Sequence, residues 1–351
     1  MRRLIAALAA ALVALLAAAG PMLACGGLIG PNGAVNLLRT TTFAGYHDGE
    51  EHYVTAFQFA GGGGKFGSIV PLPGIPTKVE RGGDWTLQRL VRETIQFETF
   101  ALAAPSADGS ARGAQVILET KVDALDITIL KGGGDDVGAW ATQHGFRLPP
   151  DAPEVLDFYA ARSPIFMAAA FDADAAQARG QQIGDGTPVH LTIPTDNPWV
   201  PLRILGLGKV AGETVSADVF LMTDSRPAIL PYPIFNGLRI DYDAPASESL
   251  LADLQADKGM EWVPDTAWLI KIGIDADAAA LKYDLAIDAS GEGHPSAVAA
   301  GLVPSAFRPA TPPGPSEDQI YRWVPGLFFG ASGVGFVAWL IGAHPSGRRP
   351  L

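Results

Sequence analysis

The stretch "VNLLRTTTFAGYHDGEEHYVTAFQF", residues 35–59, decides what kind of fold this chain can form. Its two ends, Val35–Thr42 and Glu51–Phe59, are rich in β-branched and aromatic residues, which favour extended strands. Between them lies Asp48-Gly49, a dipeptide that readily adopts the positive φ angles of a two-residue hairpin turn. The stretch therefore predicts an antiparallel hairpin, around which the rest of the chain has to build a sheet.

Strand-like and helix-like segments follow the hairpin in irregular alternation. The predicted strands are 66–73, two within 114–132, 165–172, 190–195, 200–208, 216–224 and 267–277. The predicted helices are 84–97 with Asp84 as its cap, one from Asp135 or Asp136 to a stop at Gly145, Pro153–Ala161, and one capped by Ser247 that stops at Gly259. This order predicts an α+β fold with mixed, mostly antiparallel sheets and a few short helices.

The carboxyl end carries the strongest membrane signal. Val324–Ala343 is a run of 20 residues without a charge, and at 1.5 Å per residue a helix of that length crosses a hydrocarbon core of about 30 Å. Aromatic residues lie near both of its ends, at Tyr321, Trp323 and Trp339. We expect a single transmembrane helix at 324–343, a proline-rich spacer at 304–323 and a short cytoplasmic tail at 344–351, which contains two arginines. The alternative is a buried core helix.

The amino end has the pattern of a secretory signal peptide. Arg2 and Arg3 precede the apolar run Leu4–Ala19, and a break follows at Gly20-Pro21. We expect residues 1–24 to be the signal peptide, with an uncleaved signal anchor as the alternative. In both cases residues 25–303 form the extracytoplasmic α+β part of a single-pass membrane protein, as one domain or two subdomains.

Cys25 is the only cysteine, so the chain forms no intramolecular disulfide. The preceding residues, "MLAC", are similar to the lipobox of bacterial lipoproteins, in which the cysteine is lipidated. Lipidation of Cys25 and ordinary cleavage near Ala24 or Ala19 are both open at this point.

The charge balance limits the partners. The chain has 37 acidic and 25 basic residues and a formal net charge of −12, which argues against binding to nucleic acid or to anionic lipid surfaces. Gly326 and Gly330 lie one helical turn apart in the predicted span, a spacing that lets two membrane helices approach closely. They predict either a homo-oligomer or contact with another membrane protein.

Four segments together are similar to one bacterial exported family. They are "CGGLI" at 25–29, "YVTAFQFAGGGGKFGSIVPLPGIPTKVE" at 53–80, the segment 127–171 with its Trp-bearing helix, and "PWVPLRILGLG" at 198–208. The chain resembles the family catalogued as domain of unknown function 2330 over about residues 25–275. The resemblance implies no activity, cofactor or catalytic residue, and the C-terminal span looks like an addition found in only some members.

"HDGEEH", residues 47–52, is the densest group of metal-ligand residue types. With a two-residue turn at 48–49, His47 faces Glu50 across the hairpin and His52 lies on the same face. Two imidazoles and a carboxylate are a ligand set for zinc in an open site. The alternative is a solvated hairpin tip. Loose calcium binding is also predicted at four acidic residues, although they do not match a calcium-binding loop: Asp275, Asp277, Asp284 and Asp288.

No motif predicts catalysis. "GGGGK" at 61–65 has neither the hydroxyl residue nor the helix that a phosphate loop needs. Cys25 has no base beside it, and His144 and His190 are interpreted as structural histidines. Single tryptophans at 85, 140, 199, 262 and 268 are typical of core positions rather than of a ligand groove. The sequence therefore favours a membrane-anchored binding or interaction module without a cofactor. The alternatives are a metal-binding protein or metal-dependent enzyme, and an accessory subunit of a membrane complex.

Overall fold

The hairpin predicted at Asp48-Gly49 is present in the computed structural model as β4 (Arg39–His47) and β5 (Glu50–Gln58). Asp48 and Gly49 have φ angles of 50° and 82°, and His47 pairs with Glu50. The first strand continues to the turn, five residues beyond its predicted end. The structure describes residues 22–23, 27–30, 33–34, 39–58, 65–83, 85–94, 116–122, 125–172, 186–233 and 237–303.

The larger sheet is built around this hairpin. Its strands run in the order β15 (Leu238–Pro245), β16 (Trp268–Asp277), β13 (Thr214–Thr223), β4, β5, β11 (Gly186–Pro194) and β7 (Lys78–Arg81). A short strand, β1 (Met22–Leu23), also pairs with β4. Neighbours are antiparallel except for β13 and β1, which run parallel to β4.

Two further sheets complete the β structure. One is antiparallel throughout and has the order β3 (Gly33–Ala34), β2 (Gly27–Gly30), β6 (Lys65–Pro71), β10 (Ile165–Asp172), β9 (Leu125–Lys131) and β8 (Val116–Val122). The smallest joins β12 (Trp199–Val200), β17 (Leu285–Asp288) and β14 (Ala228–Leu230). The prediction of mixed, mostly antiparallel sheets with short helices is confirmed.

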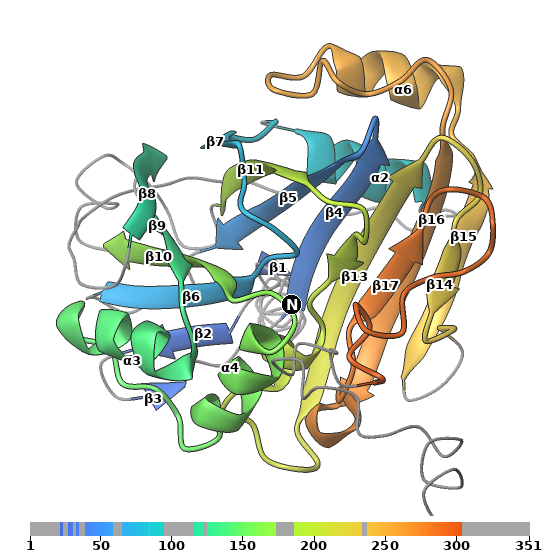
Figure 1. Ribbon diagram of the computed structural model, residues 1–351. Helices are drawn as coiled ribbons and strands as arrows, with labels where there is room; N and C mark the ends of the chain where they lie inside the picture. Colours follow the sequence, from blue (N-terminus) through green and yellow to red (C-terminus); the bar gives the residue numbers. More distant parts are fainter. Residues whose placement is uncertain are drawn as a thin grey trace, which may run out of the picture. The chain divides into compact units, whose positions relative to one another are not determined.

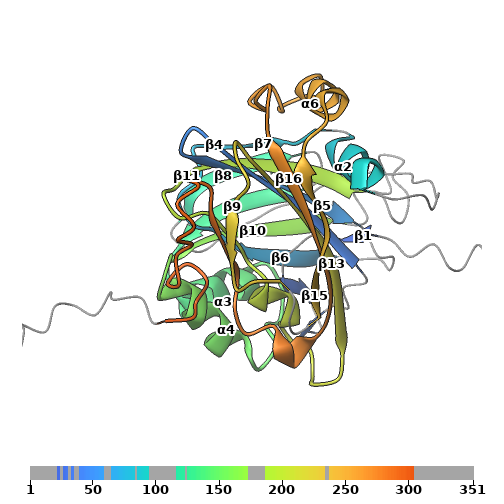
Figure 2. The same ribbon diagram turned by 90° about the vertical axis from the view of Figure 1, so that its right-hand side faces the viewer.

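Alternation of side chains along the strands divides the core into three layers. The inner faces of the larger sheet and of the six-stranded sheet pack on each other, with Tyr53, Met167 and Val219 buried between them. The outer face of the six-stranded sheet is covered by α3 (Gly134–Gln143) and α4 (Ala152–Ala160). The outer face of the larger sheet is covered by α2 (Thr86–Thr94) and α6 (Glu248–Gln255). Figures 1 and 2 show the two helix pairs beside different sheets.

The helix boundaries follow the predicted capping residues in part. The Ser247 hydroxyl accepts a hydrogen bond from the Leu250 amide at the start of α6, as expected. Gly145, the predicted stop, has a φ of 79° and follows the C-cap residue His144 of α3. Asp136 lies inside α3 rather than before it, and its carboxylate accepts a hydrogen bond from the Gly133 amide. The predicted cap Asp84 lies outside the described residues.

The strand predicted at 200–208 is wrong over most of its length. Only Trp199–Val200 is extended, and a 3₁₀ helix, η1, occupies Arg203–Gly206. The cause is a set of buried acceptors. The Asp284 carboxylate accepts hydrogen bonds from the amides of Leu202 and Arg203, and the Tyr159 hydroxyl accepts one from the Ile204 amide. The backbone amides of this apolar run therefore find hydrogen-bond acceptors without pairing with a neighbouring strand.

The described residues belong to one compact unit, residues 1–305. No helix among them is long and apolar enough to cross a membrane. The predicted spacer, membrane helix and tail, with Gly326 and Gly330, lie outside the described residues, and so do Cys25 and all of the predicted signal peptide except Met22 and Leu23. The membrane anchor, the helix packing and the lipidation remain predictions.

Candidate functional site

A cavity of about 460 Å³ opens on the outer face of the larger sheet. Strands β5 and β11 form its floor, the segment leading into β7 forms one side, and the loop after α6 forms the other. Its lining residues are Glu50, His52, Thr77, Lys78, His190, Thr192, Gly259, Glu261 and Trp262.

Two histidines on neighbouring strands meet at the floor of this cavity. Nδ1 of His52 on β5 lies 3.0 Å from Nε2 of His190 on β11. Only 5% of His52 and 2% of His190 is exposed. Burial lowers the pKa of His52 to about 3, helped by the charge that His190 would carry, and burial lowers the pKa of His190 to about 4. Both imidazoles are therefore neutral at neutral pH.

The charge of Glu80 favours one arrangement of the protons on the two rings, although its carboxylate is too far from His190 for a hydrogen bond. Nδ1 of His190 lies 3.6 Å from Oε1 of Glu80, and a carboxylate favours a protonated nitrogen over a lone pair at that position. His190 therefore carries its proton on Nδ1 and accepts a hydrogen bond at Nε2 from Nδ1–H of His52. The remaining nitrogen of His52, Nε2, is a lone-pair acceptor that has no hydrogen-bond partner among the described residues and belongs to the cavity lining.

Trp262 holds the His52 ring in place. The two rings are stacked, with centroids 3.8 Å apart and an interplanar angle of 4°. The stack needs a glycine on the adjacent strand: Gly45 is paired with His52, and a Cβ atom at Gly45 would lie 2.1 Å from Cη2 of Trp262. A side chain at position 45 would therefore displace the indole from the imidazole.

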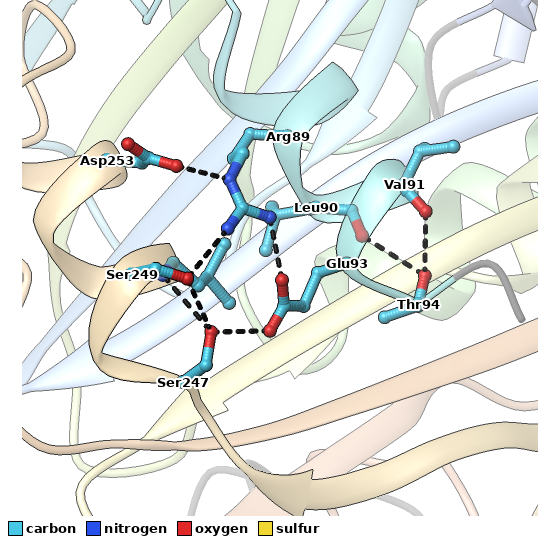
Figure 3. A network of polar contacts seen from close by, with 9 residues as sticks. Arg89, Leu90, Val91, Glu93, Thr94, Ser247, Ser249 and Asp253 are labelled. Carbon is cyan, nitrogen blue, oxygen red and sulfur yellow. Dashed lines mark hydrogen bonds and ion pairs between the residues drawn. The ribbon is translucent and has the colours of Figure 1, made fainter.

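An ion-pair network fixes α6, which leads into the loop that carries Trp262 (Figure 3). Nε of Arg89 on α2 lies 2.6 Å from Asp253 on α6, and Nη1 lies 2.7 Å from Glu93. The Ser247 hydroxyl donates to Glu93 at 2.6 Å, so the cap of α6 is part of the same network. Helices α2 and α6 are thereby held together on the sheet.

Asp257 fixes the loop after α6. Its carboxylate, 3% exposed as a residue, accepts hydrogen bonds from the Thr86 hydroxyl at 2.8 Å and from the Trp85 amide at 3.1 Å. The Gln255 side-chain amide donates to the carbonyl oxygen of Val263 at 3.0 Å. Hydrogen bonds thus hold both ends of the segment 256–263, which forms one wall of the cavity.

The predicted zinc ligands are only partly brought together. Glu50 and His52 both line the cavity. His47 lies at the hairpin end, where Nδ1 is 2.7 Å from Asp224 and Nε2 is 3.5 Å from Asp48. Among the residues that the structure describes, no three His, Cys, Asp or Glu side chains are arranged to hold a metal ion. Zinc binding by His47, Glu50 and His52 remains a prediction.

The four acidic residues predicted to bind calcium loosely lie in separate hydrogen-bond networks. Asp284 is fully buried and accepts from Tyr159 and from two backbone amides. Asp275 accepts from Ser216, Asp277 from the Ala279 amide, and Asp288 from Ser290. His144, for its part, hydrogen-bonds through Nδ1 to the carbonyl oxygen of Trp140.

A family model described as an uncharacterized protein conserved in bacteria (DUF2330) matches residues 19–232. The chain belongs to this family. The DUF2330 segment includes the hairpin, His52, Glu80 and His190, whereas α6 and Trp262 come after it. The cavity thus combines residues of the DUF2330 segment with residues that follow it.

Three solved structures are distantly similar to this DUF2330 chain, and no curated protein matches it. Baculovirus P35 is 9% identical with a TM-score of 0.37, and the match covers 72% of this chain and 96% of that one. A mutated baculovirus P35 after caspase cleavage is 9% identical with a TM-score of 0.36, covering 72% and 99%. The caspase-8/P35 complex gives 11% identity and a TM-score of 0.32, covering 72% and 90%.

Proposed function

We propose that this DUF2330 protein is an exported binding protein, held at a membrane by residues 324–343, whose ligand occupies the cavity beside His52. One observation carries the proposal: a nearly buried imidazole presents an unpartnered Nε2 to a cavity. Nε2 opens on the cavity, where a ligand that donates a hydrogen bond can reach it. The stack on Trp262 and the bond to His190 hold this acceptor in one orientation, which suits binding.

Binding is favoured over covalent catalysis by what surrounds His52. In the described part of the cavity no serine, threonine or cysteine is hydrogen-bonded to its imidazole. The Thr77 hydroxyl donates to the backbone carbonyl of Thr192 at 3.2 Å. A base without an adjacent nucleophile supports recognition rather than acyl transfer.

The membrane placement is supported by the basic, apolar amino end and by the uncharged run at 324–343. We expect the full-length protein to stay in membranes that are washed with alkaline carbonate. Val334→Arg together with Val337→Arg places two charges within the run and should release most of the protein. Leu302→Arg, outside the run, is the matched control and should change nothing. Release of the unaltered protein by the wash contradicts the anchor.

Ligand binding is tested on the full-length protein in detergent micelles by titration calorimetry with putrescine, agmatine, N,N′-diacetylputrescine, succinate and glycerol. We expect at least one compound to bind saturably, and His52→Asn to weaken it tenfold or more. Asparagine keeps a donor near the position of Nδ1, and so the contact to His190, while it removes Nε2. Tyr232→Ala, in a separate cavity of about 320 Å³, is the control and should leave binding unchanged.

The ¹⁵N resonance of His52 Nε2 in the unaltered protein reports the same contact without any substitution. A compound that binds in the cavity should shift that resonance. If none of the five compounds binds, or if binding neither shifts the resonance nor depends on His52, the proposed function is wrong.

A further inference from the structure

We infer that the ligand of the His52 cavity is an organic cation that donates N–H bonds, a primary ammonium or guanidinium group on a small amine. The inference rests on the proposed function, since it assumes that the cavity binds a ligand. It comes from the polar groups of the lining, among which acceptors and negative charge outweigh donors: one imidazole lone pair and two carboxylates stand against the Thr192 hydroxyl, which can donate and accept, and the buried indole N–H of Trp262, which has no partner in the described part of the chain.

The first acceptor is Nε2 of His52. The negative charge of Glu80, 3.6 Å from Nδ1 of His190, favours the proton of His190 on that nitrogen, and the bond between the histidines then places the proton of His52 on Nδ1 as well. The cavity therefore receives a lone pair and no N–H donor from this ring. A ligand group that only accepts hydrogen bonds would face that lone pair without a partner.

Two carboxylates add negative charge to the lining. Glu50 is half-buried, and its carboxylate forms no hydrogen bond or ion pair with another described residue. Glu261 is exposed and accepts hydrogen bonds from its own amide and from the Gly259 amide, which lower the pKa of its carboxyl. Both side chains can therefore pair with a cation at neutral pH.

The one basic side chain of the lining does not balance these charges. Nζ of Lys78 lies 2.5 Å from Oε1 of Glu80, so its charge is already paired. An anionic ligand would have to lie against Glu50 and Glu261, and the described lining holds no second basic side chain to meet it.

A bare metal ion fits the lining less well than an amine. Among the described residues no three potential ligands are close enough to coordinate one ion. An ammonium or guanidinium group has several N–H donors and is larger than a metal ion. It can therefore donate to acceptors on β5 and on the loop after α6 at the same time.

The test compares cations with matched neutral and anionic compounds on the full-length protein at constant ionic strength. Agmatine and putrescine should bind, N,N′-diacetylputrescine at least tenfold more weakly, and succinate not at all. Glu261→Gln should weaken agmatine about tenfold; its side chain is exposed, so the variant is expected to fold. Glu292→Gln removes one exposed carboxylate elsewhere and should leave agmatine binding unchanged.

Other results would contradict either the proposed ligand class or the proposed binding function. If succinate or diacetylputrescine binds through His52 while agmatine does not, the ligand class is wrong and the binding cavity stands. Agmatine binding that is equal in Glu50→Gln, Glu261→Gln and the unaltered protein also overturns the class. If no compound binds at all, the ligand class and the proposed function both fail.

Discussion

Replacing Asp284 by alanine is expected to lower the free energy of unfolding by about 4 kcal/mol, because it leaves a buried guanidinium without its counter-charge. Asp284 is fully buried. Its carboxylate forms an ion pair with Arg162 and accepts hydrogen bonds from the Tyr159 hydroxyl and the Leu202 amide at 2.8 Å each, and from the Arg203 amide at 3.0 Å. One side chain thus joins α4, η1 and β17.

The surroundings of Arg162 offer no substitute for Asp284. Its guanidinium lies over the rings of Phe158 at 4.2 Å and Trp199 at 4.9 Å, and its Nη1 donates to the Ala299 carbonyl. Aromatic faces and a single carbonyl stabilise a cation less than a carboxylate does. In the alanine variant the charge stays buried without an anion, and two backbone amides lose their acceptor.

Urea unfolding of the full-length protein in detergent, followed by tryptophan fluorescence, measures the effect. Asp284→Asn should lower the free energy of unfolding less than the alanine variant does, since the side-chain amide oxygen still accepts hydrogen bonds from the backbone. Asp253→Ala removes an exposed partner of Arg89 and should cost no more than about 1 kcal/mol. A loss at Asp284→Ala no larger than that at Asp253→Ala would show that the buried pair contributes little.

The fold could be predicted from the sequence where neighbouring residues alone determine the backbone conformation. Asp48-Gly49 determines a turn by its φ angles, and the turn then determines that His47 pairs with Glu50. The same reasoning fails at 200–208, because the backbone there bends to reach Asp284, which lies more than 70 residues later. Strand β15, "LRIDYDAP", was missed because it lies at the edge of its sheet and most of its side chains are only half-buried.

The sequence predicted only part of the candidate site. His52 could be singled out from the hairpin register, but its partner His190 comes 138 residues later, and only the order β5–β11 in the sheet brings them together. Trp262 was interpreted as a core residue because nothing near it in the sequence shows that the loop after α6 returns to the sheet. One local signal existed: Gly45 is a glycine inside a strand, opposite His52, and such a position indicates a close approach.

The second large effect is expected at Glu51, where glutamine should stabilise the protein by about 3 kcal/mol at pH 7. Glu51 points into the core between the sheets and is 0% exposed. Oε2 accepts a hydrogen bond from the Trp199 amide at 3.3 Å, while Oε1 has no partner in the described part of the chain. Burial raises the pKa of this carboxyl to about 8, against a small lowering by the Trp199 amide.

The sign of the effect follows from proton binding. Between an unfolded pKa of 4.5 and a folded pKa of about 8, the folded state keeps a proton that the unfolded state has lost. The free energy of unfolding therefore falls by about 1.4 kcal/mol for each pH unit over this window. Glutamine has the shape of the protonated carboxyl and cannot ionise, so Glu51→Gln removes this loss. Its advantage should be small below pH 4.5, reach about 3 kcal/mol at pH 7, and level off at its largest value above about pH 8.

Urea unfolding at pH 4, 5.5, 7 and 8 compares Glu51→Gln with the unaltered protein and with Glu292→Gln, a change at an exposed position. The exposed variant should stay within about 0.5 kcal/mol of the unaltered protein throughout. The difference in unfolding free energy between Glu51→Gln and the unaltered protein should grow with pH, because Glu51 keeps a proton in the folded state that it loses on unfolding. A constant difference would mean that Glu51 is ionised in the folded protein at neutral pH. The buried carboxylate would then need a cationic partner or water that the described contacts of β5 and β12 do not supply.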